Sequence, residues 1–111
     1  MTITPNILEE TSRGIQSYAI EDMMLKNREI FLTSAINDQS AVDTIKQLMY
    51  LDHKSADPVT IYINSPGGSV ISGMAIYDYI RLMCSPVTTV CVGTAASMGA
   101  ILFLSGSRRM M

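Results

Sequence analysis

The sequence predicts an α/β fold of repeated β-α units around a mainly parallel sheet. Three β-rich runs, at residues 28–33, 59–63 and 87–92, are each followed by helical spacing or by a helix start. The units are about 30 residues long, enough for a strand, a crossover helix and the return to a neighbouring strand. With 111 residues, the chain forms at most one domain.

Composition narrows the class of protein. The net charge is −2 and the pI is near 5.1, which does not favour binding to nucleic acid or to an anionic membrane. No apolar run is long enough to span a membrane, and the N-terminus lacks the regions of a secretory signal, so we expect a cytoplasmic protein. Hydrophobic residues make up 48% of the chain, which is typical of a protein with an apolar surface for a partner or of a piece of a larger domain.

The two cysteines do not suggest a metal site or a disulfide. Cys84 and Cys91 form no CxxC pair, and we expect both to be buried free thiols in a reducing compartment. No group of residues has the composition and spacing of metal ligands. The sequence therefore predicts neither a metal nor a cofactor.

The first third of the chain changes from an arm to a strand. Residues 1–20 carry no sustained period, and Ser12-Arg13-Gly14 predicts one turn within an extended arm. Residues 21–26 are expected to form a short helical turn. Residues 28–33 then read as a strand with a largely buried centre.

Two helices are expected in the middle of the chain. The first is capped by the polar cluster at 37–40 and ends near His53-Lys54, where basic residues suit a helix C-terminus. The second runs from about Val70 to Met83 and stops at Ser85-Pro86. The expected stripe of the first contains Ala41, Val42, Ile45, Leu48, Met49 and Asp52, and that of the second contains Val70, Met74, Tyr77, Ile80 and Cys84.

A glycine-rich loop follows each of the last two strands. Strand 59–63 leads into Asn64-Ser-Pro-Gly-Gly68. Strand 87–92 leads into Gly93-Thr-Ala-Ala-Ser97, where a third helix begins and continues to about Gly106. The strands are expected to be parallel, so both loops leave the carboxyl edge of the sheet and can meet there. Sites in α/β sheets form at this edge.

The second loop has the layout of a nucleophile turn. A strand, a turn of small residues and a helix together lift the hydroxyl of Ser97 out of the sheet, although a serine there can also be a plain N-cap. Acyl transfer needs N–H donors about 3 Å from the oxyanion, and those of Gly68 and Met98 would supply two. Neither phosphate-loop pattern, GxxxxGK(S/T) or GxGxxG, is present, which argues against nucleotide binding.

Several blocks of the sequence are specific enough to compare with known families. They are Glu10-Thr-Ser-Arg-Gly14, Arg28-Glu-Ile-Phe-Leu32, Ile61-Tyr-Ile-Asn-Ser-Pro-Gly-Gly-Ser69, Gly73-Met-Ala-Ile-Tyr-Asp78 and Gly93-Thr-Ala-Ala-Ser-Met-Gly-Ala100. In this order, and over nearly the whole chain, the sequence resembles the proteolytic subunit of the Clp protease.

The resemblance implies a crotonase-like α/β fold and a self-compartmentalising serine endopeptidase. The family's subunits form heptameric rings that stack in pairs around a chamber, and an ATP-driven AAA+ unfoldase feeds them polypeptide. Ser97 matches the nucleophile of the family, and the N–H groups of Gly68 and Met98 match its oxyanion donors. Tyr62 and Val90 match apolar residues that help to receive the docking loops of the unfoldase.

The resemblance also implies what the chain lacks. Residues 1–20 match an arm near the axial pore, and residues 21–111 match the first part of a single domain, incomplete at its C-terminus. The family's catalytic His and Asp follow the nucleophile, so we expect either the front of a longer active subunit or a truncated or degenerate product. The only histidine, His53, is expected to be partly exposed at a helix end, and Thr60 replaces a family tyrosine in the docking pocket.

Two other functions remain open. A non-catalytic structural paralogue would occupy ring positions, although the presence of Ser97 and of Gly67-Gly68 argues against it. A crotonase-type acyl-CoA enzyme also uses backbone N–H donors but needs no serine at position 97. Membrane-bound peptidases of signal sequences are disfavoured, because the chain contains no anchor sequence.

The isolated chain is predicted to be unstable or to aggregate, and not to cleave peptides. An open sheet edge and apolar helix faces would remain exposed, and no base would be present to activate the serine. Size-exclusion chromatography and a peptide-hydrolysis assay on purified residues 1–111 test this. Peptidase activity that depends on Ser97 would contradict it.

Overall fold

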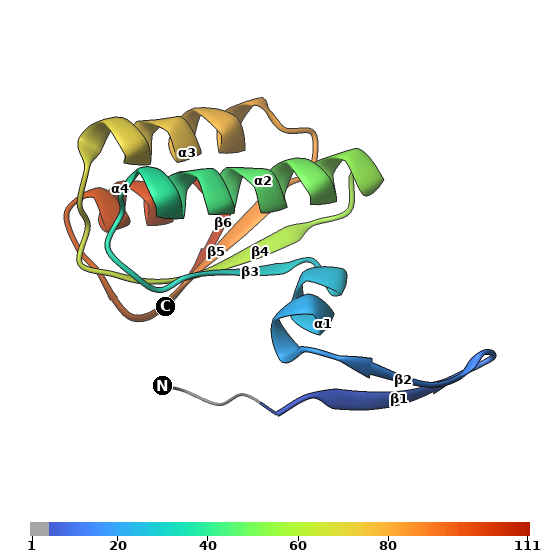
Figure 1. The fold of residues 1–111 in the computed structure, drawn as a ribbon. Helices are drawn as coiled ribbons and strands as arrows, with labels where there is room; N and C mark the ends of the chain where they lie inside the picture. The colour runs from blue at the N-terminus through green and yellow to red at the C-terminus, as the bar shows by residue number, and fades with distance from the viewer. Residues whose placement is uncertain (1–4) are drawn as a thin grey trace.

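The computed structural model describes residues 5–111 and confirms the α/β class. Its elements are β1 (Ile7–Thr11), β2 (Gly14–Tyr18), α1 (Ile20–Lys26), β3 (Glu29–Leu32), α2 (Asp38–Lys54), β4 (Val59–Ser65), α3 (Val70–Leu82), β5 (Val87–Ala95), α4 (Met98–Leu104) and β6 (Arg108–Met110). Strands β3, β4, β5 and β6 form a parallel sheet in that order. Helices α2, α3 and α4 lie together over one face of this sheet (Figure 1).

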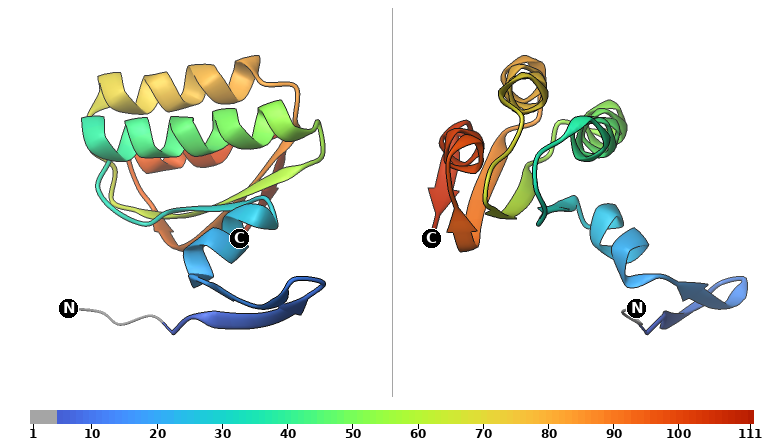
Figure 2. Two further views of the ribbon diagram at one scale, coloured as in Figure 1. Left: turned by 45° about the vertical axis from the view of Figure 1, so that its right-hand side comes forward. Right: turned by 60° about the vertical axis from the view of Figure 1, so that its left-hand side comes forward.

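The N-terminal arm is a β-hairpin followed by a short helix. Strands β1 and β2 pair antiparallel across a turn at Ser12 and Arg13, where the sequence predicts one. Figure 2 shows the hairpin and α1 projecting away from the three helices that cover the sheet. Residues 1–4 of the predicted arm lie outside the described residues. No helix within residues 5–111 combines the length and the apolar character needed to cross a bilayer.

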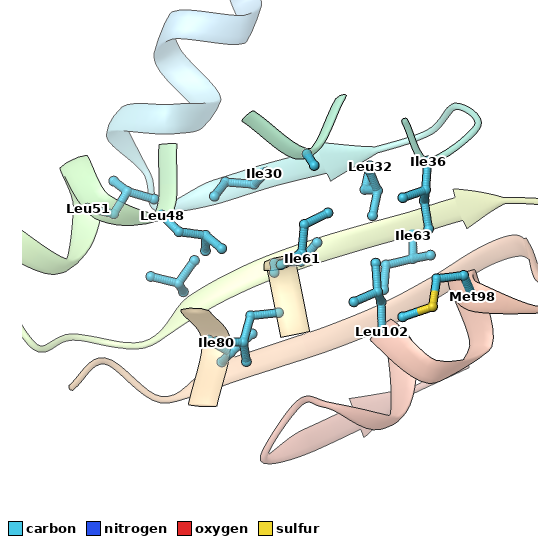
Figure 3. Packing of buried hydrophobic residues seen from close by; sticks show 14 residues of the cluster. Ile30, Leu32, Ile36, Leu48, Leu51, Ile61, Ile63, Ile80, Met98 and Leu102 are labelled. Atoms are coloured by element: carbon cyan, nitrogen blue, oxygen red, sulfur yellow. The ribbon is translucent and has the colours of Figure 1, made fainter. Parts of the chain in front are cut away.

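The hydrophobic core lies between the sheet and its helices. Alternate residues of β3 and β4 point into it, and Ile30, Ile61 and Ile63 are each 1% exposed. Leu48 of α2 and Leu102 of α4 close the core from the helix side (Figure 3). Each such side chain contributes roughly 1.5–3 kcal/mol when it is fully buried, so this layer fixes the helices on the sheet.

The buried face of α2 differs from the prediction. Val42 and Met49 were expected in the apolar stripe, but both are exposed. Thr44 and Leu51 are buried in their place, together with Ala41 and Leu48 as expected. Apolar residues occur on more than one side of α2, so its spacing alone does not define the side that meets the sheet.

The predicted face of α3 is right at Ile80 but wrong in its first turns, for a packing reason. Val70 and Met74 are exposed, whereas Gly73 and Ile76 are buried. A Cβ atom on Gly73 would collide with the side chain of Met98, because α3 and α4 approach closely there. Small residues therefore face the neighbouring helix, and larger apolar side chains are left on the outer surface.

Two further burial predictions are only partly right. Cys84 is exposed and Cys91 is only half-buried, although both are free thiols as expected. In β3, Ile30 and Leu32 are buried but Phe31 between them is 46% exposed. Helices cover only one face of the sheet in the described residues, so alternate strand residues remain accessible on the other.

Polar contacts close the edge of the sheet where the strands begin. The guanidinium of Arg28 donates hydrogen bonds to the carbonyl oxygens of Leu51 and Ser55, at 3.0 and 3.1 Å. The carboxylate of Asp52 accepts from the N–H and the hydroxyl of Ser85, at 2.9 and 3.0 Å. The bond from the Ser85 N–H is the main reason that the pKa of Asp52 lies below its ordinary value of 3.8.

Candidate active site

The two glycine-rich loops meet at the carboxyl edge of the sheet, as predicted. A Cβ atom placed on Gly67 would lie only 2.8 Å from both the Ala96 carbonyl oxygen and Ser97 Cβ. The same atom would lie 3.1 Å from the Met98 nitrogen. The φ of Gly67 is +98°, which also favours glycine. The approach of the loops therefore requires a residue without a side chain at position 67.

Ser97 occupies the N-cap position of α4 but does not act as a cap. Its φ is 54° and its ψ is −121°, and its hydroxyl accepts no capping hydrogen bond. By contrast, Asn37 and Ser69 cap α2 and α3 with extended backbones and side-chain bonds to Ser40 and Ser72. The exposed hydroxyl of Ser97 thus remains available, on a strained backbone of the kind that is found at active sites.

Two backbone N–H groups have no acceptor within residues 5–111: that of Met98, which follows Ser97, and that of Gly68, which follows the residue packed against Ser97. Met98 is the first residue of α4, where N–H groups lack partners inside the helix. Gly68 pairs with Ile36 in a parallel β-bridge. The Ile36 N–H donates to the Gly67 carbonyl oxygen at 2.9 Å, and the Ser69 N–H donates to the Ile36 carbonyl oxygen at 2.8 Å. The bridge uses the Gly67 carbonyl and the Ser69 N–H, and it leaves the Gly68 N–H free.

The residues that hold these loops were missed by the sequence analysis. Ser65 is 0% exposed, and its hydrogen bonds reach Ser34 on the β3 side and Ala96 on the β5 side of β4. The side chain of Asn64 accepts from the Thr94 N–H at 3.1 Å, beside Gly93. The sequence does mark Asn64 and Ser65, because they are two polar residues at the end of an apolar strand, directly before Pro-Gly-Gly.

The histidine is not part of this arrangement. His53 lies exposed in the last turn of α2, a helix that begins at the carboxyl edge of the sheet and ends at the opposite edge. Ser97 and His53 are therefore at opposite ends of the sheet. Within the described residues, no group of three or more His, Cys, Asp or Glu side chains is arranged to hold a metal ion.

Tyr62 and Val90 lie side by side on the other face of the sheet. They are register partners on β4 and β5, and the ring of Tyr62 stacks on Phe31 of β3 with centroids 4.9 Å apart. The Tyr62 hydroxyl donates to the Glu29 carboxylate at 2.7 Å. That bond, helped by burial, raises the pKa of Tyr62 above its ordinary value of 10.0. Thr60 of β4 pairs with Thr88 of β5, so the row of side chains next to Tyr62 and Val90 is less apolar.

Comparison with known proteins identifies the family. The Clp protease family matches residues 12–111 of the chain. The chain belongs to the Clp protease family. It is also 45% identical over 105 residues to the ATP-dependent Clp protease proteolytic subunit 1 of Salinibacter ruber (strain DSM 13855 / M31). That match covers 94% of this chain but only 45% of the relative, so the chain spans less than half the length of this Clp protease subunit.

Substituting Gly67 is expected to destabilise this Clp-family chain through the contact between its loops. Gly67→Ala should cost roughly 1–3 kcal/mol more than Gly14→Ala, because overpacking adds to the cost of positive φ. Gly14 is a matched control, since its φ is +102° but nothing lies within 4 Å of an added Cβ. Urea unfolding of the intact protein measures both. Equal losses would mean that the loops do not need the close approach.

Proposed function

We propose that this chain carries the nucleophile and the oxyanion hole of an ATP-dependent serine endopeptidase of the Clp type. Ser97 would be the nucleophile, and the N–H groups of Gly68 and Met98 would be the oxyanion donors. The observation that carries the proposal is the free hydroxyl of Ser97 on a strained N-cap, at the meeting point of two loops that each hold an unused N–H donor. The substrates would be unfolded polypeptides in the cytoplasm.

The proposed reaction is acyl transfer. The Ser97 oxygen attacks the peptide carbonyl carbon, the carbonyl oxygen gains the negative charge, and the two N–H groups stabilise that oxyanion. The acyl-enzyme forms when the amine leaves, and water then hydrolyses it. A base must take the proton of the serine, and His53 lies at the wrong end of the sheet for this task. We propose that the family's His and Asp, outside residues 1–111, complete the site.

The other two functions differ in what they require of Ser97. A non-catalytic ring subunit would keep the fold but would not react at Ser97. A crotonase-type acyl-CoA enzyme would use the N–H groups of Gly68 and Met98 without the hydroxyl. Reactivity of the Ser97 hydroxyl therefore separates the proposal from both alternatives.

Ser97→Ala in the intact assembly is expected to abolish labelling by a fluorophosphonate probe. It should also lower the kcat for peptide hydrolysis by about 10³-fold or more, because the acyl-enzyme can no longer form. Mass spectrometry locates the label, and a fluorogenic peptide gives kcat. Ser107→Ala is the control, because Ser107 is an exposed serine between the C-terminal end of α4 and β6. An unlabelled wild-type assembly would favour the structural paralogue, and turnover that survives Ser97→Ala would favour the acyl-CoA enzyme.

The partners we propose are an AAA+ unfoldase and further copies of the subunit in stacked heptameric rings. Large apolar side chains on α3 support association, since Val70, Ile71 and Leu82 are 65%, 86% and 78% exposed. The hairpin within residues 1–20 would lie near the axial pore, and residues 21–111 would form the first part of the subunit's domain.

The unfoldase would dock on the sheet face that no described helix covers. Phe31, Tyr62, Val90 and Met110 are register neighbours on four successive strands, so they form a continuous apolar row. Phe31 and Met110 are 46% and 48% exposed. Such a row suits an apolar loop of a partner protein.

Tyr62→Ala is expected to reduce degradation of folded proteins by the unfoldase complex at least about tenfold, because aromatic anchors dominate interface energetics. Hydrolysis of short peptides, which need no unfoldase, should stay within about twofold. Thr88→Ala is the matched control, since Thr88 lies on the same face in the polar row beside Thr60. An equal loss of both activities would indicate a general folding defect and would contradict the docking role.

A further inference from the structure

Ser65 bonds to both loops of the candidate site. Its hydroxyl donates to the Ser34 carbonyl oxygen at 2.7 Å and accepts from the Gly67 N–H at 3.1 Å. Its carbonyl oxygen accepts from the Ala96 N–H at 3.0 Å. The side chain is 0% exposed, so water cannot replace these partners without a local rearrangement. One buried residue therefore joins three separate segments of the chain.

Each of these contacts is next to a group that the proposed chemistry uses. Gly67 directly precedes the donor Gly68, and Ala96 directly precedes Ser97. The segment that starts at Ser34 continues to Ile36, which brackets Gly68 through its two backbone bonds. These hydrogen bonds of Ser65 go to Ser34, Gly67 and Ala96, and not to Ser97 or to the two donors themselves.

We infer that Ser65 is a positioning residue that holds the Gly68 N–H in register with Ser97. This inference rests on the proposed function of Ser97. The carbonyl contact to Ala96 is made by the backbone, so any residue at position 65 keeps it. The hydroxyl contact to Gly67 depends on the serine, so its loss displaces the Gly68 donor and leaves the Ser97 turn in place. Ser65 thus acts on stabilisation of the oxyanion and not on the nucleophile itself.

Helix α4 lies close against the backbone and the Cβ atom of Ser65. A Cβ atom on Gly99 would lie 2.9 Å from the Ser65 carbonyl oxygen and 3.4 Å from Ser65 Cβ. Helix α4 therefore packs directly on Ser65. A side chain at this position must be small, buried, and able both to donate and to accept a hydrogen bond, and serine meets all of these requirements.

Ser65→Ala in the intact assembly is expected to lower the kcat for a short fluorogenic peptide roughly tenfold, with KM within about twofold. Ser85→Ala is the matched control. Ser85 is also buried, at 2% exposure, and its hydroxyl also joins separate segments, but it lies at the opposite edge of the sheet. It should lower the melting temperature to a similar extent and leave kcat unchanged. An unchanged kcat in Ser65→Ala, or an equal fall in Ser85→Ala, would overturn the inference.

Hydrogen exchange separates this inference from the proposed function. The Gly67 amide should exchange at least about tenfold faster in Ser65→Ala than in the wild-type protein, whether or not the assembly is a peptidase. Faster exchange combined with an unlabelled wild-type Ser97 would leave the contact standing and refute the proposed function. Unchanged exchange would refute the inference alone.

A second variant tests the inference where Ser65→Ala does not assemble. Ser65→Cys, which keeps a weak donor in a side chain of similar shape, should give an intermediate kcat. Full activity of Ser65→Cys would overturn the inference.

Discussion

The close approach of two backbones, at Gly67 and at Ser97, decides how this edge of the sheet is built. A single added Cβ would lie 2.8 Å from Ser97 Cβ, so the contact exists only because position 67 has no side chain. Strands β4 and β5 are parallel neighbours, so their following loops emerge together at the same edge. The free hydroxyl and the two free N–H groups are consequences of this arrangement.

The strained turn at Ser97 is held by the core below it. Met98, the next residue, is 2% exposed and packs against Gly73 of α3. Leu102, one turn further along α4, is 1% exposed. An exposed serine therefore directly precedes a deeply buried methionine, and this burial compensates for a backbone conformation that costs about 1–3 kcal/mol. The sheet and its helices thus hold the hydroxyl away from the core.

Local signals in the sequence predicted most of the elements and the main site residues. The β-branched alternation of residues 59–63 and the polar cap at 37–40 correspond to β4 and to the start of α2. The helix faces were harder to predict, because apolar residues occur on several sides of α2 and α3. Ser65 was missed for a different reason: its role comes from three bonding partners that are distant from it or follow it, and no spacing rule identifies them.

The sequence by itself determined the alternation of strands and helices over residues 28–104, the two glycine-rich loops and the membership of the Clp protease family. These properties depend on residue types and short spacings, which are local. Only the tertiary structure decided which helix sides are buried, that Ser97 leaves its N-cap hydrogen bond unmade, and that the row from Phe31 to Met110 is open. Each of these depends on contacts between residues far apart in the chain, and such contacts are fixed by packing on one face of the sheet.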